Sequence, residues 1–206
     1  VLVPAFFQVF GAIGVPDSAK MHLAVGSSLA IVVVTSIRSY FGHKRHNAVD
    51  ENLLRGWIIA VPAGALLASA AAAYMSSGML RAVFAVVCIL IAVKLLVGRD
   101  DWRLGKDLPG NPLRAVVGAA IGFLSTLMGI GGGVLNNTFM TAYGRPIHQA
   151  VATSAGIGML IAIPGFLGYI WAGLGQTGLP PFSTGFVNWL AVALLIPMSI
   201  IVTPYG

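Results

Sequence analysis

A cluster of glycines inside a long apolar stretch is the part of this sequence best suited to binding a solute. The cluster comprises Gly129, Gly131, Gly132 and Gly133. Each glycine destabilises a helix by about 1 kcal/mol relative to alanine, so this cluster predicts a break. In a membrane, the helix that restarts after a break offers free backbone amides that attract anions. Close packing between helices is the competing interpretation.

Polar residues follow the glycines directly, in the half-helix expected after the break. They are Asn136, Asn137 and Thr138. Polar groups inside a membrane are costly unless they have partners. These side chains are therefore expected either to line a solute path or to bind the backbone groups that the glycines leave free.

Two hydroxyl pairs, Ser27-Ser28 and Thr153-Ser154, each lie near the start of an apolar segment. A single serine or threonine in a membrane helix often bonds back to its own backbone. These two pairs occupy equivalent places, each behind a short or broken segment. The four residues are therefore candidate ligands for an oxyanion.

Histidines and carboxylates are too sparse in the apolar segments for catalysis or a metal site. Ser154 lies six positions after His148, about 240° around a helix, so the two cannot act as nucleophile and base. His43 and His46 alone are too few to hold a metal. No catalytic residue, metal or cofactor is expected. His22 and His148 are expected to be interfacial, with proton coupling as the alternative.

The composition indicates that these segments lie in a membrane. Of 206 residues, 57% are hydrophobic and 9% charged, whereas soluble domains carry about 25% charged residues. The formal net charge is +6, but no basic helix is interleaved with stacking aromatics, so nucleic acid is not an expected partner. The expected fold class is an all-α integral membrane protein, a polytopic helix bundle.

Apolar runs of about 20 residues, the length needed to cross a bilayer, define the expected spans. They are 21–41, 53–74, 79–98, 149–171 and 186–205. The stretch 113–143 is too long for one straight span, and it either crosses with a break or turns back as a hairpin. Nine of the 12 Lys and Arg residues lie near the loops after the first and third spans, which places these loops in the cytoplasm. Lys20, Arg81 and Arg145 are expected on the other side, except that Arg145 would change sides if 113–143 forms a hairpin.

A weak internal repeat divides the chain. Residues 22–28 match 148–154 at a constant offset of 126 positions (22 to 148), sharing His, Ala, Val and Ser. Duplicated halves are common in secondary transporters, and the substrate then binds between the halves near mid-membrane. The expected organisation is two internally repeated halves with Gly-broken helices, over 1–98 and 113–206, joined by a cytoplasmic linker over 99–112.

These motifs resemble the TauE/SafE sulfite exporter family, also called toluene-sulfonate uptake permeases. The resemblance rests on the segments 129–133, 144–158 and 164–170. In that family a glycine-rich break is followed by a short helix and an Ala-x-x-Thr-Ser element, once in each half. Residues 1–6 are similar to the piece just after the glycine cluster of the first half. That cluster and a last segment are therefore expected to lie outside 1–206.

The resemblance implies a multi-pass permease of the bacterial inner membrane that moves sulfite, sulfonates or related small anions, usually outward. The four glycines, Thr153 and Ser154 would take the roles of the family motif, with Ser27 and Ser28 as their partners in the first half. The sequence departs from the family at Thr138, where proline is usual, and in having Asn136-Asn137.

The expected function is export of a small sulfur-containing anion by alternating access, with the anion and the lipid bilayer as partners. Self-association into a homo-oligomer is left open. An anion leaving a negative interior gains about 2.3 kcal/mol per 100 mV, so efflux needs no coupled ion. The alternative is a non-transporting membrane scaffold or assembly subunit, in which the glycines serve helix packing.

Overall fold

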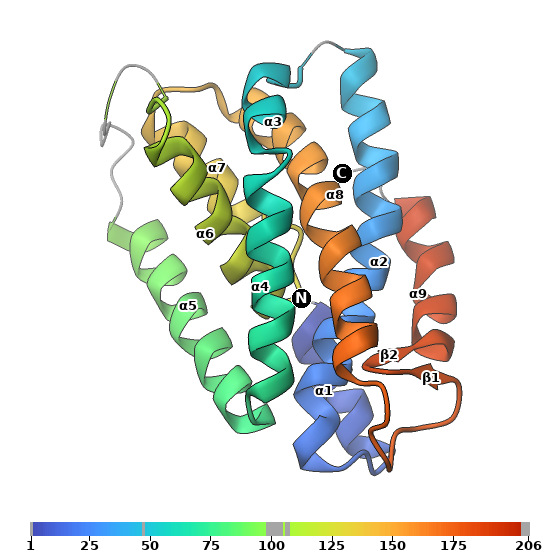
Figure 1. The fold of residues 1–206 in the computed structure, drawn as a ribbon. Coiled ribbons are helices and arrows are strands. Elements are labelled where there is room, and N and C mark those ends of the chain that lie inside the picture. The colour runs from blue at the N-terminus through green and yellow to red at the C-terminus, as the bar shows by residue number, and fades with distance from the viewer. Residues whose placement is uncertain (1, 47, 98–104, 106–107, 203–206) are drawn as a thin grey trace.

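The computed structural model describes residues 2–46, 48–97, 105 and 108–202, and within this part it is a helical bundle (Figure 1). The helices are α1 (Leu2–Ala12), α2 (Asp17–Arg45), α3 (Glu51–Trp57), α4 (Ala60–Tyr74), α5 (Ser77–Val97), α6 (Leu113–Leu127), α7 (Gly133–Ala142), α8 (Ile147–Ala172) and α9 (Trp189–Val202). Two short antiparallel strands, β1 (Ser183–Thr184) and β2 (Val187–Asn188), precede α9. The predicted all-α fold class is confirmed.

Several predicted features fall partly outside the described residues. The predicted linker 99–112 lies outside them except for 105 and 108–112, and three of its cations are among the residues not described, Arg99, Arg103 and Lys106. The ends of two predicted spans, at 98 and 203–205, also lie outside the described part. The division into 1–98, 99–112 and 113–206 stays a prediction.

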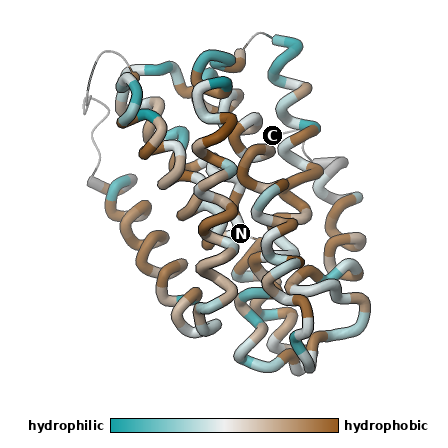
Figure 2. The backbone as a smooth tube through the Cα atoms, in the orientation of Figure 1, coloured by the Kyte–Doolittle hydropathy of each residue, from teal (hydrophilic) through white to brown (hydrophobic). Residues whose placement is uncertain are grey.

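Long apolar helices match four of the five predicted membrane spans; the fifth, 186–205, extends past the described residues, and α9 covers 14 residues of it. By length and composition, α2, α8 and the segment Ser77–Lys94 of α5 can each cross a membrane, and α3 with α4 forms a fourth span if the pair, bent by 46°, is taken as one. Hydrophilic residues gather at the two ends of the bundle, and the helices between them are mostly apolar (Figure 2). This arrangement is that of a membrane protein.

The stretch 113–143 turns back as a hairpin. Arg114, at the start of α6, and Arg145, just after α7, line the same cavity together with Asp50. Figure 1 shows α6 running into the bundle and α7 returning to the same end. Of the two alternatives that the sequence left open, the structure shows the hairpin, and Arg145 therefore lies at the same end as Arg114 and not with Lys20 and Arg81.

The end of the bundle that holds Lys44, Arg55, Arg114 and Arg145 is called here the cation-rich end. Glu51 of α3 joins Lys44 at 3.3 Å and Arg55 at 3.5 Å, which ties the end of α2 to α3. The excess of cations agrees with the predicted cytoplasmic side of these loops, and their position in the cytoplasm stays a prediction.

The half-helix α1 mirrors α7. It starts in the middle of the bundle and runs to the end opposite the cation-rich end (Figure 1). Both half-helices close in a Schellman motif, which needs a left-handed residue after the helix. In α1 the amide of Val15 donates to Phe10 O (3.0 Å), and in α7 that of Arg145 donates to Met140 O (3.0 Å). The internal duplication of the chain stays a prediction.

Small residues let the central helices approach closely. α2 packs along α8, and α4 packs along both α6 and α8. A side chain at Gly64 of α4 would collide with the backbone carbonyl of Ala119 in α6, and one at Gly122 with that of Val61. Small residues at membrane helix contacts favour such packing, since lipid supplies no hydrophobic drive between helices. The core therefore holds the hairpin firmly against the long spans.

Candidate solute-binding site at the helix break

The break between α6 and α7 is built by two glycines with left-handed backbone conformations. Gly129 has φ +64° and Gly132 has φ +71°, angles that other residues adopt only with strain. Gly129 ends α6, because the amide of Ile130 donates to Ser125 O at 3.0 Å, the closing bond of a Schellman motif. Gly132 is the N-cap of α7. The polypeptide thus leaves one helix and starts another inside the bundle.

The first turn of α7 presents free backbone amides. The first bond of this helix runs from the Asn136 amide to Gly132 O at 2.9 Å. The amides of residues 133–135 precede that bond and have no carbonyl in a preceding turn. The positive end of the helix dipole adds to their attraction for an anion. The α7 N-terminus therefore supplies an anion-attracting group without a charged side chain.

Two hydroxyls, those of Ser125 and Thr126, lie at the end of α6 immediately before the break. Both side chains are fully buried, and neither hydroxyl has a hydrogen-bond partner among the described residues. A Cβ on Gly132 would lie 3.4 Å from Ser125 Oγ, so this hydroxyl faces the start of α7. An unpaired buried hydroxyl costs about 1–3 kcal/mol. Ser125 is thus suited to bind a polar solute or water at the break. Thr126 Oγ1 faces α8 instead, since it would lie 3.4 Å from a Cβ added to Gly165.

Ser28 connects α2 to the break. Its Oγ donates to Gly129 O at 2.7 Å. Its neighbour Ser27 faces elsewhere, and Ser27 Oγ accepts from the Asn188 amide of β2 at 3.0 Å. Of the first predicted hydroxyl pair, only Ser28 lies at the break.

Ser154 and the two asparagines form a hydrogen-bonded network one turn into α7. Asn136 Nδ2 donates to Ser154 Oγ (2.7 Å), and Ser154 Oγ donates to Asn137 Oδ1 (2.6 Å). Asn136 is fully buried, and its Oδ1 has no partner among the described residues. Thr138 is half-buried on the same helix. The structure thus joins three of the predicted site residues and leaves one buried acceptor unused.

Thr153 is occupied by packing contacts at the cation-rich end. Its Oγ1 donates to Gln149 O at 2.7 Å and accepts from the Asp50 amide at 2.9 Å. The four predicted hydroxyls therefore do not converge on one ligand, since Ser28 and Ser154 lie toward the hairpin and Ser27 and Thr153 do not. Their role as anion ligands stays a prediction.

The two candidate proton-coupling histidines have different surroundings. His22 is buried, with Nε2 3.0 Å from Ala72 O and its ring stacked on Phe186 at a centroid distance of 4.7 Å. His148 is exposed in the first turn of α8. The contacts of His22 are those of a packed residue, and proton coupling stays a prediction for both.

Ser125 and Thr126 were missed by the sequence analysis. The signal available was their position, two adjacent polar residues just before a glycine cluster in an otherwise apolar run. Together with the break they define a class of protein, an α-helical membrane protein whose re-entrant hairpin turns back inside the bundle and offers unpaired polar groups there.

The family comparison agrees with this class. The family model described as Sulfite exporter TauE/SafE matches residues 1–206, and the chain belongs to this family. This is a family of transporters, and the protein is a membrane transporter. No solved structure matches the chain.

Curated relatives from three organisms are each named a "Probable membrane transporter protein". The Haemophilus influenzae relative is 29% identical over 208 residues, covering 100% of this chain and 78% of the relative. The Methanocaldococcus jannaschii relative is 26% identical over 201 residues, covering 97% and 73%. A Bacillus subtilis relative is 26% identical over 216 residues, covering 96% and 75%.

Proposed function

We propose that this chain forms a multi-pass permease of a bacterial inner membrane that exports a small sulfur-containing anion, such as sulfite or a sulfonate, by alternating access. The observation that carries the proposal is the helix break, where the unpaired hydroxyl of Ser125 faces the start of α7 and its free amides. The family membership supports the sulfur-containing substrate.

Neutral dipoles would replace the water around the anion. No charged residue occurs between 115 and 144, which covers the interior of the hairpin. Binding by amides and hydroxyls is weaker than binding by a fixed cation, and this suits release on the far side. The anion would gain about 2.3 kcal/mol per 100 mV on leaving a negative interior, so the membrane potential suffices to drive export.

Alternating access would come from the two half-helices. α1 and α7 start near mid-depth and run to opposite ends of the bundle (Figure 1). A Cβ on Gly129 would lie 2.7 Å from a Val3 methyl, so the start of α1 packs on the break. Rocking of one half against the other would then open the break first to one side and next to the other.

A scaffold or assembly subunit is the second candidate, and one observation favours it. A Cβ added to Gly129 would lie 2.7 Å from Val3 Cγ2, and one added to Gly131 would lie 2.8 Å from Val32 Cγ1. These glycines therefore also allow close packing. In that case the break would be only a packing device, and the unpaired hydroxyls would have no solute to bind.

The experiment that tests the permease is sulfite efflux from liposomes under an imposed potential, comparing wild type with the double variant Ser125→Ala/Thr126→Val. The expected result is voltage-dependent efflux that the folded double variant loses by about tenfold or more, because the unpaired hydroxyls at the end of α6, including that of Ser125 beside the start of α7, are gone. Thr141→Val is the matched control, since Thr141 Oγ1 bonds only to carbonyls of its own helix, Asn137 O (2.7 Å) and Thr138 O (3.3 Å).

Efflux of equal rate in the double variant would contradict this placement of the site. A folded wild type that moves neither sulfite, sulfonate nor thiosulfate would contradict the permease itself and favour the scaffold.

A further inference from the structure

A polar hollow lies at the cation-rich end, where the hairpin enters and leaves the bundle. Its volume is about 560 Å³. Its wall includes Arg114 at the start of α6, Arg145 just after α7 and Gln149 in the first turn of α8. Two carboxylate residues, Asp50 and Glu51, also line it. Whether this hollow attracts anions or cations depends on which of these charges are already paired.

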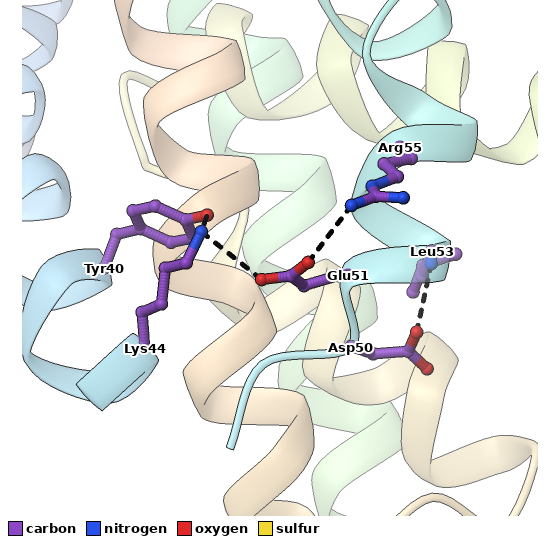
Figure 3. Close-up of polar contacts among 6 residues, drawn as sticks. All are labelled: Tyr40, Lys44, Asp50, Glu51, Leu53 and Arg55. Carbon is purple, nitrogen blue, oxygen red and sulfur yellow. Dashed lines mark hydrogen bonds and ion pairs between the residues drawn. The ribbon is translucent and has the colours of Figure 1, made fainter. Parts of the chain in front are cut away.

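Both carboxylates are engaged by other groups. Glu51 contacts Lys44 Nζ through Oε1 at 3.3 Å and Arg55 Nη2 through Oε2 at 3.5 Å (Figure 3). Asp50 Oδ1 accepts from the Leu53 amide at 3.0 Å and so caps α3 (Figure 3). Two nearby cations thus offset the charge of Glu51, and the carboxylate of Asp50 is bound to the start of a helix.

The two arginines are not paired with these acids. Among the described residues, no ion pair joins Arg114 or Arg145 to a carboxylate. Arg145 is half-buried, and its Nε is fully buried without a hydrogen-bond partner in the described part of the chain. Arg114 Nε donates only to Pro109 O, at 3.2 Å. A buried guanidinium donor without an acceptor is costly, and an oxyanion is the ligand that its planar fork matches best.

We propose that Arg145, with Arg114 and Gln149, forms an oxyanion-binding vestibule that collects the substrate before it reaches the break. This inference rests on the proposed permease function, and it identifies the ligand as a free, small oxyanion. The guanidinium groups supply the charge and the Gln149 amide a further donor. The positive potential of the cation-rich end raises the local anion concentration, an effect that salt screens.

The vestibule and the break are connected by α7. The Arg145 amide closes this helix on Met140 O, and Gly133 begins it. α7 is ten residues long, which corresponds to about 15 Å at 1.5 Å per residue. An anion held by Arg145 would therefore move about this distance along the hairpin, from strong charged donors to the weaker neutral ones.

The test is sulfite binding by the full chain in nanodiscs of zwitterionic lipid, followed by the shift of the thermal unfolding midpoint with sulfite concentration. Arg145→Gln is expected to raise the half-saturating sulfite concentration about tenfold or more, because charged hydrogen bonds are lost. Arg38→Gln is the matched control, since it removes one charge from an exposed arginine of α2 that does not line the hollow. It is expected to change the concentration less than twofold.

A second variant guards against misfolding of Arg145→Gln. Arg145→Lys keeps the positive charge but loses the planar guanidinium group. Its half-saturating sulfite concentration is expected to lie between those of wild type and Arg145→Gln. Nanodiscs with phosphatidylglycerol distinguish a free anion from a lipid headgroup. Sulfite binding that persists there supports the vestibule, and binding abolished by the anionic lipid overturns it as a substrate site.

Flux measurements separate this inference from the permease proposal. If wild type moves sulfite and Arg145→Gln behaves like Arg38→Gln in binding, the vestibule is overturned and the permease stands. If sulfite binding depends on Arg145 but folded wild type moves no sulfite, the oxyanion site is upheld and the permease proposal fails.

Discussion

The glycines of the break differ in what a side chain would meet at each position. Gly129 and Gly132 have positive φ angles, and Gly131 is crowded by a Val32 methyl that would lie 2.8 Å from its Cβ. Gly133 has no atom within 4 Å of an added Cβ. Only at Gly133, therefore, can a side chain be added without disturbing the turn or the packing.

This difference predicts opposite outcomes for two alanine substitutions. Gly132→Ala is expected to lower the free energy of unfolding by about 2 kcal/mol or more, because the left-handed backbone costs about 1–2 kcal/mol and the new Cβ would lie 2.5 Å from Ile161 Cδ1. Gly133→Ala should change it by less than about 0.5 kcal/mol or stabilise the helix start. Unfolding in one detergent measures both, and equal destabilisation would contradict this account of the break.

Adjacent hydroxyls on one helix reach different partners. Neighbouring positions are about 100° apart around a helix. Ser28 accordingly bonds to the break while Ser27 bonds to β2, and Ser154 bonds to the asparagines while Thr153 bonds to the Asp50 amide. The sequence pattern could therefore predict which helices carry polar groups, but not which member of each pair faces the hairpin.

For other site residues, the sequence indicated a position but not a partner. Hydroxyls in membrane helices usually bond to their own backbone, so nothing marked Ser125 and Thr126 as unpaired. Arg145 could be placed only after the direction of α7 was known, because its side of the membrane depends on whether the chain crosses or returns. In each case the missing information was a tertiary contact.

At the scale of elements, the hairpin of α6 and α7 places unpaired polar groups of Ser125, Thr126 and Asn136 inside the bundle. The glycine spacing predicted a break, and the structure ends α6 at Leu127 and restarts at Gly133. The sequence does not determine the direction of the chain after the break. A stretch of 31 residues (113 to 143) is long enough for either a bent crossing or two half-crossings of about 15 Å each.

The hairpin makes a prediction about sidedness. Single cysteines at Gly110 before α6, at His148 after α7 and at Gln176 after α8, in a Cys88→Ser background, are expected to report two sides. Gly110→Cys and His148→Cys should react with a membrane-impermeant maleimide from one side, and Gln176→Cys from the other, because α8 separates His148 from Gln176. Labelling of sealed vesicles and of inverted vesicles measures this.

Reaction of His148→Cys from the side of Gln176→Cys would instead mean that the stretch 113–143 crosses completely. The hairpin, and the vestibule that depends on it, would then both be wrong.

At the scale of the whole molecule, the break lies between cavities at opposite ends of the bundle. The hollow at the cation-rich end has a volume of about 560 Å³, and a smaller one of about 120 Å³ lies at the other end between Phe7, Asp17 and Arg81. α7 leads from the break toward the first, and α1 leads from it toward the second (Figure 1). The residues that line these two cavities lie outside the break, so a path through the break that opens to one end at a time stays a prediction.

The central claim is that the break binds the transported anion, and the most direct test is sulfite flux through Gly133→Val in liposomes. A valine there would project beside the free amides of α7 and is expected to abolish flux in a protein that still folds. Gly42→Val is the matched control, because Gly42 lies in α2 and likewise has no atom within 4 Å of an added Cβ. The account predicts that Gly133→Val loses flux and Gly42→Val keeps it. Equal flux through both folded variants would contradict it.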